Sequence, residues 1–183
     1  MISSPPLACR RLLPVLRSVS PASPLPPSLP FRPVIDGVLM ATLAEVGSLS
    51  RDITHELVGA RSFDAMMASA CDNLMETTTY QRSEECGGAV LVVERPDGLA
   101  ASVIASRYLR DLLAHALGPG PHLVALPCPD TLLATPVGSG MTCRLDWIMR
   151  NSACEGATAL TPSLIAVEAA GMRVVAQRRT TTR

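Results

Sequence analysis

Four polar residues in the middle of the chain have side chains of the types that catalyse hydrolysis, namely Asp97, Ser102, His122 and Asp130. Asp97 lies in the turn RPDG and Asp130 in the turn CPD, each beside a proline. The two carboxylates would act as a pair only if the two turns meet in space. Without that meeting, each aspartate is expected to accept hydrogen bonds from backbone N–H groups of its own turn. The sequence leaves both roles open.

Ser102 and His122 lack the surroundings that activate a nucleophile and a base. Ser102 lies in a segment, AASVIAS, that is predicted to be helical, whereas a catalytic serine sits on the sharp turn of a G-x-S-x-G motif. His115 and His122 flank the turn GPGP and, beside Asp130 or Cys128, would form a polar cluster suited to proton transfer. No third group that would orient them is identifiable. We therefore expect His115 on the exposed face of a helix and His122 at the start of a strand.

The sequence contains no motif for a phosphate, a cofactor or a metal ion. GPGP includes two prolines, which lack the N–H groups of a phosphate cradle, and VGSGMT at 137–142 lacks the lysine of a phosphate-binding loop. The six cysteines include no C-x-x-C pair and no histidine at the spacing of a zinc site. Because no secretory signal is recognisable, we expect free thiols that pack as small apolar groups. We predict neither a metal nor a cofactor.

The balance of charge argues against several classes of partner. All 16 basic residues are arginines, and 16 acidic residues offset them. Without a net positive field, and with only 3% aromatic residues, we expect no binding to nucleic acid or to an anionic membrane surface. No apolar run approaches the roughly 18 to 20 residues that cross a bilayer. These observations predict a soluble protein of the cytoplasm.

Short apolar runs rich in β-branched residues predict the strands that would position these side chains. The predicted strands are residues 89–94, 122–127 and 131–136, and two more about a turn within 163–177. The second and third runs are separated only by the turn CPD, which is long enough for a hairpin but not for a parallel crossover. The sequence therefore predicts a mainly antiparallel sheet.

Apolar residues at three- and four-residue steps predict the helices. These are residues 41–47, a helix between Ser50 and Gly59, 63–76 capped by Ser62, 99–117, and 143–156 with Trp147 on its buried side. Residues 77–88 are predicted to be a polar connection. The methionines of 63–76 form either part of the core or a soft surface for a partner. Together with the sheet, these helices predict an α+β fold with the helices packed on one face.

The first 36 residues differ from the rest in composition. Residues 1–33 contain nine of the 16 prolines, four arginines and no acidic residue. Because each proline removes a backbone donor and restricts φ, this composition predicts disorder over 1–36. A transit peptide for an organelle, or translation that starts at Met40, are the alternatives. The expected organisation is then one domain over 41–177 and a frayed C-terminus at 178–183.

Three short motifs occur in a recognisable order after residue 60. They are ACDNL at 70–74, DGLAAS at 97–102 and LVALPCPDTLLA at 123–134. This set resembles the YtpQ-like proteins, a bacterial family of unknown function, over roughly residues 60–177. The family's P-x-x-D pattern falls on Pro127 and Asp130, although Cys128 and Pro129 replace a more polar pair, and the similar proteins have a longer structured N-terminal part. The resemblance implies a soluble bacterial α+β protein and supplies no reaction.

These features favour a non-enzymatic domain that binds a protein partner or forms a homo-oligomer. The predicted contact surface is a sheet edge or the methionine-rich helix at 63–76. The alternative is a small hydrolase with a polar site at the Asp97 and Asp130 turns. Convergence of these aspartates with Ser102 and His122 in one pocket would favour the enzyme, and their dispersal would favour the binding domain. A regulatory or immunity-type protein encoded beside its target is a third interpretation.

Overall fold

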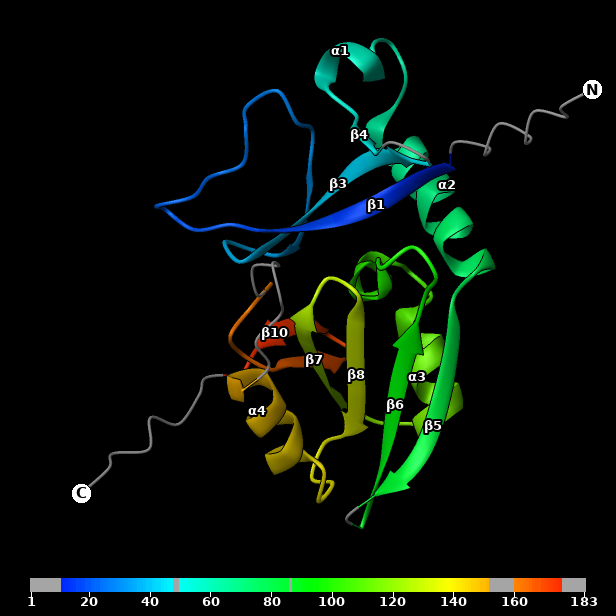
Figure 1. Cartoon of the computed structure of the whole chain (residues 1–183), viewed down its shortest axis with the longest axis vertical. Coiled ribbons are helices and arrows are strands. Elements are labelled where there is room, and N and C mark those ends of the chain that lie inside the picture. Colours follow the sequence, from blue (N-terminus) through cyan, green and yellow to red (C-terminus); the bar gives the residue numbers. More distant parts are fainter. Residues whose placement is uncertain (1–10, 48–49, 86, 152–159, 176–183) are drawn as a thin grey trace, which may run out of the picture.

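The computed structural model describes residues 11–47, 50–85, 87–151 and 160–175. In Figure 1 the described elements form two antiparallel sheets, a small one built from the first strands of the chain and a larger one built from the later strands. Helix α2 (Phe63–Glu76) runs from the small sheet toward the outermost strand of the larger one. The prediction of an α+β fold with antiparallel sheets is confirmed. The predicted frayed C-terminus, residues 178–183, lies outside the described residues.

The larger sheet has six strands, all paired antiparallel, in the order β10-β9-β7-β8-β6-β5. Its strands are β5 (Thr79–Glu85), β6 (Gly88–Glu94), β7 (His122–Cys128), β8 (Thr131–Pro136), β9 (Ile165–Glu168) and β10 (Gly171–Val174). The predicted hairpin of β7 with β8 and the predicted pair of β9 with β10 are both confirmed. β5 lies where the sequence predicts a polar connection. Its ladder with β6 uses only backbone groups, so polar side chains do not prevent it.

Helices cover both faces of the larger sheet, so the prediction that they pack on one face is wrong. Leu91 of β6 belongs to the core beneath η1 (Ala100–Ala105) and α3 (Leu109–Leu117). Its neighbour Val90 belongs to a second core beneath α4 (Thr142–Asn151), on the opposite face. Successive side chains of a strand point to opposite faces of the sheet. A continuously apolar strand is therefore stable only where other elements pack on both faces.

Helix α4 contacts the sheet through a different stripe from the predicted one. Leu145 and Met149 are buried against the second core, whereas Trp147 is 63% exposed. Two residues along a helix correspond to a rotation of roughly 200°, so a side chain at 147 cannot share the face of 145 and 149. The predicted buried position of Trp147 is therefore wrong. The segment 152–156, also predicted to be helical, lies outside the described residues.

The small sheet contains much of the segment that the composition predicts to be disordered. Its strands are β1 (Arg11–Ser18), β2 (Arg32–Ile35), β3 (Leu39–Val46) and β4 (Arg51–Asp52). β3 is central, with β1 along one side and both β2 and β4 along the other. The predicted disorder of residues 1–36 is therefore wrong for 11–18 and 32–35, and the domain does not begin at residue 41.

β1 forms despite its proline because prolines are compatible with edge strands. β1 is the outer strand of the small sheet, and Pro14 lies opposite Leu43 without needing to donate a ladder hydrogen bond. The apolar residues of the same strand, Leu13 and Leu16, are 2% and 6% exposed and share one core with Leu91 of the larger sheet. One continuous core therefore unites the two sheets.

Several predicted helices are changed by tertiary contacts. Residues 41–46, predicted to be helical, belong to β3, because strands pair with both of its sides. The helix predicted over 99–117 is divided into η1 and α3, and the Ser106 hydroxyl between them accepts the Tyr108 N–H at 3.2 Å. The short helix α1 (His55–Val58) has Thr54 at its N-cap rather than Ser50. None of the helices in the described ranges is both long and apolar enough to span a membrane.

Helix α2 confirms its predicted bounds and cap. The Ser62 hydroxyl accepts the Ala65 N–H at 3.3 Å at the start of the helix. Met67 and Leu74 are fully buried, and Met66 packs partly buried against the same core. Met66 and Met67 therefore contribute to the core, which is one of the two roles predicted for them.

Candidate functional site

Asp97 is the counter-ion of a buried arginine. The Arg95 side chain, 1% exposed, donates from Nε to Asp97 Oδ1 at 2.9 Å and from Nη2 to Oδ2 at 2.5 Å. Arg95 also donates to the Leu74 carbonyl and the Thr78 hydroxyl at the end of α2. A buried guanidinium needs a paired anion, because without one its charge is uncompensated. Asp97, which also accepts the Leu99 N–H at 3.2 Å, therefore holds the end of β6 against α2.

The Asp97 and Asp130 turns do meet, as a carboxylate pair would require. The Ala101 N–H, just after the first turn, donates to the Pro129 carbonyl of the second at 2.9 Å. The Asp130 carboxylate accepts the Thr131 hydroxyl at 2.9 Å and its residue is exposed. Each carboxylate is thus engaged within its own turn. The contact between the turns joins backbone groups and does not create a pair of acids.

Ser102 is a structural hydrogen-bond acceptor. It is 2% exposed, and its Oγ accepts the Leu16 N–H of β1 at 3.3 Å. This bond joins η1 to the small sheet. A nucleophilic serine must reach solvent and a base, and Ser102 reaches neither.

His122 lies far from the aspartate turns. Its ring is buried, and Nε2 lies 3.0 Å from the Gly118 carbonyl. A carbonyl only accepts, so this contact assigns the proton to Nε2. Burial lowers the pKa of His122, and the bond to Gly118 partly opposes that effect. The Asp130 turn follows the other end of β7, six residues and therefore roughly 20 Å away.

The four candidate residues consequently do not form one site. His115 lies on the exposed side of α3, as predicted. Among the cysteines of the described ranges, Cys71 and Cys143 are free, whereas Cys128 is disulfide-bonded. The expectation that all the thiols are free is wrong at Cys128. Disulfide formation depends on the distance between Cα atoms in the fold, which cysteine spacing does not reveal.

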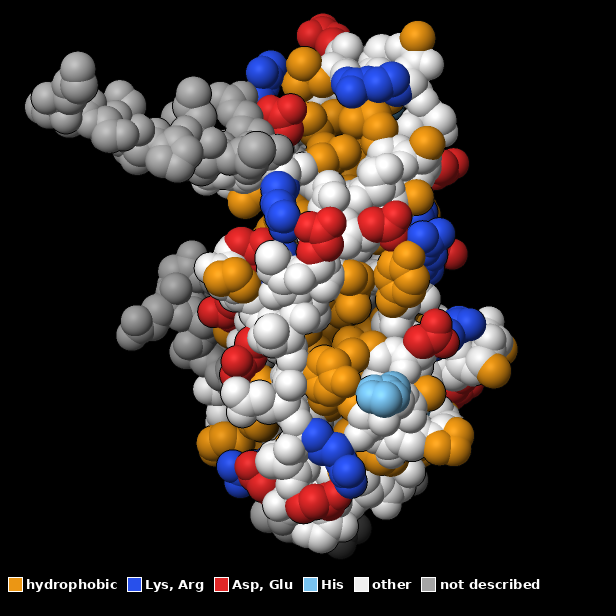
Figure 2. All heavy atoms as spheres, turned by 90° about the vertical axis from the view of Figure 1, so that its right-hand side faces the viewer, with side chains coloured by type: hydrophobic (Ala, Val, Ile, Leu, Met, Phe, Trp, Pro, Cys, Tyr) orange, Lys and Arg blue, Asp and Glu red, His pale blue; other side chains and the backbone are white. Residues whose placement is uncertain are grey.

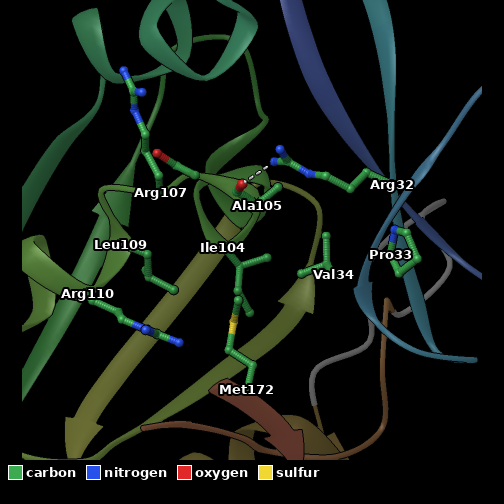
Figure 3. Close-up of a pocket in the computed structure, with 10 residues that line it drawn as sticks. Arg32, Pro33, Val34, Ile104, Ala105, Arg107, Leu109, Arg110 and Met172 are labelled. Carbon is green, nitrogen blue, oxygen red and sulfur yellow. Dashed lines mark hydrogen bonds between the residues drawn. The ribbon is translucent and has the colours of Figure 1, made fainter. Parts of the chain in front are cut away.

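A hollow that the sequence does not indicate lies at the junction of the two sheets (Figure 3). Its volume is about 400 Å³. It is lined by residues 32–34 of β2, by 104–107, Leu109 and Arg110 between η1 and α3, and by Met172 of β10. Strand β10 thus brings the end of the described chain beside strand β2 near its beginning. The site depends on the contact of two segments far apart in sequence.

Arginines supply all the charge in the lining of this hollow. Arg32, Arg107 and Arg110 line it, and none of the other described residues in the lining is charged. Arg107 turns away toward α2 and pairs with Asp72, with Nη2 and Oδ1 3.0 Å apart. Its bond to the Tyr108 hydroxyl and the nearby Asp72 charge raise the pKa of Arg107. Arg32 and Arg110 donate to backbone carbonyls at 2.9 and 3.2 Å, and neither has an ion-pair partner among the described residues.

The thiol beneath Arg32 does not neutralise it. Cys71 Sγ lies 4.0 Å from Arg32 Nη2 and 3.7 Å from the Ala105 carbonyl oxygen. Burial raises the pKa of Cys71 despite the lowering effect of the adjacent guanidinium. The thiol therefore stays protonated near neutral pH and donates to the carbonyl. Within the part of the chain that the structure describes, the positive charge of Arg32 at the rim of the hollow therefore has no counter-ion.

Comparison of the chain with protein-family models, curated proteins and solved structures finds no match. The resemblance to the YtpQ-like proteins therefore stays a prediction.

Proposed function

We propose that the protein is a non-enzymatic self-association domain whose copies pair through β5. The supporting observation is that β5 ends the six-stranded sheet with all seven of its residues exposed. No described residue pairs with its outer side. The outward N–H and C=O groups of an edge strand are a ready template for another strand.

The charges of β5 favour a second copy as the occupant. Arg82 and Glu84 lie on the same face of the strand, form an ion pair with each other and remain 52% and 64% exposed. If two copies pair antiparallel with Ser83 opposite Ser83, each Arg82 lies opposite the Glu84 of the other copy. Opposite charges directly across an antiparallel pair are favourable, and a two-fold axis repeats the contact. This register is self-complementary.

The side chains around β5 carry charges of both signs, which favours pairing with one matching partner over attraction to any highly charged molecule. Figure 2 looks onto the side of the molecule where β5 lies in Figure 1, and acidic and basic side chains are intermingled there. An interface of one strand pair is small, so we expect a weak dimer with a dissociation constant in the micromolar range or above. The predicted cytoplasmic location remains part of this proposal, and the disulfide at Cys128 is then an exception to the reduced thiols usual in that compartment.

The hydrolase alternative has lost its main support. Asp97 is bound to Arg95, Ser102 is buried against β1, and His122 lies at the other end of β7. Dispersed groups that are satisfied by local partners do not make a general acid, base or nucleophile. We therefore propose no reaction for this protein.

A charge exchange across the proposed interface tests self-association. Arg82→Glu places like charges opposite each other twice in the dimer, and Glu84→Arg does the same. The combined Arg82→Glu/Glu84→Arg variant restores both attractive pairs with the signs reversed. Each like-charge contact costs roughly 0.2 to 1 kcal/mol and each lost attraction a similar amount, so the two contacts together cost roughly 0.8 to 4 kcal/mol. We therefore expect each single variant to weaken dimerisation at least about fourfold.

The measurement is sedimentation equilibrium of the full chain over a range of protein concentrations, with thermal unfolding as the control for stability. The combined variant should dimerise within about threefold of the original chain, since its contacts are equivalent. A chain that stays monomeric at every concentration would refute the proposal. A combined variant as weak as the single variants would refute the register.

A further inference from the structure

We propose that the hollow between β2, β10 and the η1–α3 segment binds a small organic anion, in which a carboxylate or phosphate is carried on a compact apolar group. The feature that carries this inference is the approach of two arginines, neither of which has an ion-pair partner among the described residues, to one cavity whose lining is partly polar and partly apolar. In Figure 3 the side chains of Arg32 and Arg110 enter from opposite sides of the hollow. The proposal concerns a different surface from β5.

The charge balance at this hollow is positive. Three arginines line it, and within the described residues the ion pair of Arg107 with Asp72 is the one that any of them makes. These four groups carry three positive charges and one negative charge, which leaves two positive charges. Cys71 adds no negative charge, because burial raises the pKa of its thiol. An anion would supply the missing counter-charge.

Arg32 is held in position before any ligand arrives. Its Nη2 donates to the Ala105 carbonyl at 2.9 Å, and its residue is partly buried. A guanidinium has five N–H donors, so this bond leaves others available to an oxyanion. Arg110, whose residue is exposed, donates through Nη1 to the Ala169 carbonyl at 3.2 Å. Arg32, held in this way, loses little entropy on binding, and the planar donor pairs of both arginines match carboxylate and phosphate oxygens.

The remaining lining selects for an apolar body on the anion. Val34 and Met172 are partly exposed at the hollow between the two arginines, and Ile104 and Leu109, which are almost completely buried, complete its apolar lining. The volume of about 400 Å³ is within the usual range of small-molecule sites, roughly 300 to 1,000 Å³. An inorganic ion would leave the apolar lining in contact with water. A phosphate or carboxylate on an aromatic or branched aliphatic group would use both parts of the site.

The test uses the methyl group of Met172 as a local reporter in the full chain. Methionine methyls are labelled with carbon-13, and the Met172 signal is assigned with Met172→Leu. Phenyl phosphate and benzoate are titrated separately, with phenol as the neutral probe and inorganic phosphate as the probe without an apolar body. Met149, which packs in the core beneath α4, is the reference methyl.

We expect phenyl phosphate, benzoate or both to shift the Met172 methyl saturably in the millimolar range or below, while Met149 does not move. Arg110→Gln should weaken this binding at least tenfold, a loss typical of one charged hydrogen-bonding partner. The matched control is Arg150→Gln, an exposed arginine of α4, which should leave the affinity unchanged. Phenyl phosphate alone would assign a phosphate ligand, and benzoate alone a carboxylate ligand.

Three results would overturn the inference. The first is the absence of a saturable shift with either organic anion. The second is equal affinity for phenol, which would show that charge is not recognised. The third is equal affinity for inorganic phosphate, which would show that the apolar lining is not used. None of these results depends on dimerisation through β5, so this site and the proposed function stand or fall separately.

Discussion

Strands β1 and β5 are both outer strands, but their free edges have opposite surroundings. On β1, the Asn73 side chain donates to the Leu12 carbonyl at 3.1 Å, and the Leu16 N–H donates to Ser102 Oγ at 3.3 Å. On β5 all seven residues are exposed, and no described strand lies beyond it. The apolar edge is closed by side chains of α2 and η1, whereas the polar edge is open.

This difference shows how side-chain chemistry decides what an edge can do. β1 carries Leu13 and Leu16, whose burial draws α2 and η1 over the strand and brings hydrogen-bond partners with them. β5 carries Gln81, Arg82 and Glu84, which stay hydrated and attract no cover. An open edge with charged residues resists indiscriminate pairing but still permits a partner with matching charges. The comparison therefore predicts unequal consequences for mutations in the two strands.

The largest difference is expected from truncation of one side chain in each strand. Leu13→Ala should reduce the free energy of unfolding by about 2 to 5 kcal/mol, because it leaves a cavity in the common core. Gln81→Ala in β5 should change it by less than about 0.5 kcal/mol, since the residue is exposed. Urea unfolding followed by circular dichroism measures both values.

Equal, small effects of Leu13→Ala and Gln81→Ala would show that β1 does not belong to the core. That result would restore the interpretation of the first 36 residues as a tail that the domain does not need.

The same two strands mark the limit of what the sequence predicts. Local patterns identify α2, the β7–β8 hairpin and the turn at Gly98, because apolar periodicity, capping residues and a positive φ are properties of short segments. β1 contains Pro14 and two arginines, and β5 is polar apart from Tyr80, so neither has the apolar run or alternation from which the other strands are predicted. Both are strands because a neighbouring strand offers a backbone ladder, which composition does not record.

The candidate sites show the same division. The sequence predicts that Asp97 and Asp130 lie in turns, because each stands beside a proline. It does not predict that Arg95 forms an ion pair with Asp97. The arginine-lined hollow is missed because Arg32 lies in the predicted tail and Arg110 on an ordinary exposed helix face. One signal was present: residues 1–33 contain four arginines and no acid. The position of Arg32 beside β10 follows only from tertiary packing.

An intermediate effect is expected when the cover of β1 is removed one bond at a time. Ser102→Ala leaves the buried Leu16 N–H without a partner and should cost about 1 to 3 kcal/mol. Asn73→Ala exposes the Leu12 carbonyl at a partly buried position and should cost about 0.5 to 1.5 kcal/mol. Urea unfolding measures the two costs. Thr131→Ala, which removes an exposed bond to Asp130, is the control and should have almost no effect.

If Ser102→Ala proved as harmless as Thr131→Ala, the hydrogen bond to Leu16 would not be what closes the edge of β1. The comparison would then rest on apolar burial alone. A loss of dimerisation in Ser102→Ala without a loss of stability would also contradict the assignment of association to β5.

The smallest effect is expected on β7, a central strand with neighbours on both sides. His122 is buried and neutral there, and burial lowers its pKa below the ordinary value of 6.5. The unfolded chain therefore binds a proton before the folded chain does as the pH falls below 6.5. The stability of the original chain should decrease as the pH falls from above 6.5 toward the folded pKa, and His122→Gln should reduce that decrease.

Urea unfolding at several pH values above about 5 measures this effect and avoids most of the carboxylate titrations. His115→Gln, on the exposed side of α3, is the matched control and should keep the original pH dependence. The same slope in the original chain and in His122→Gln would mean that the ring does not pay a burial penalty, and that the central strand tolerates a charge as readily as the open edge of β5 does.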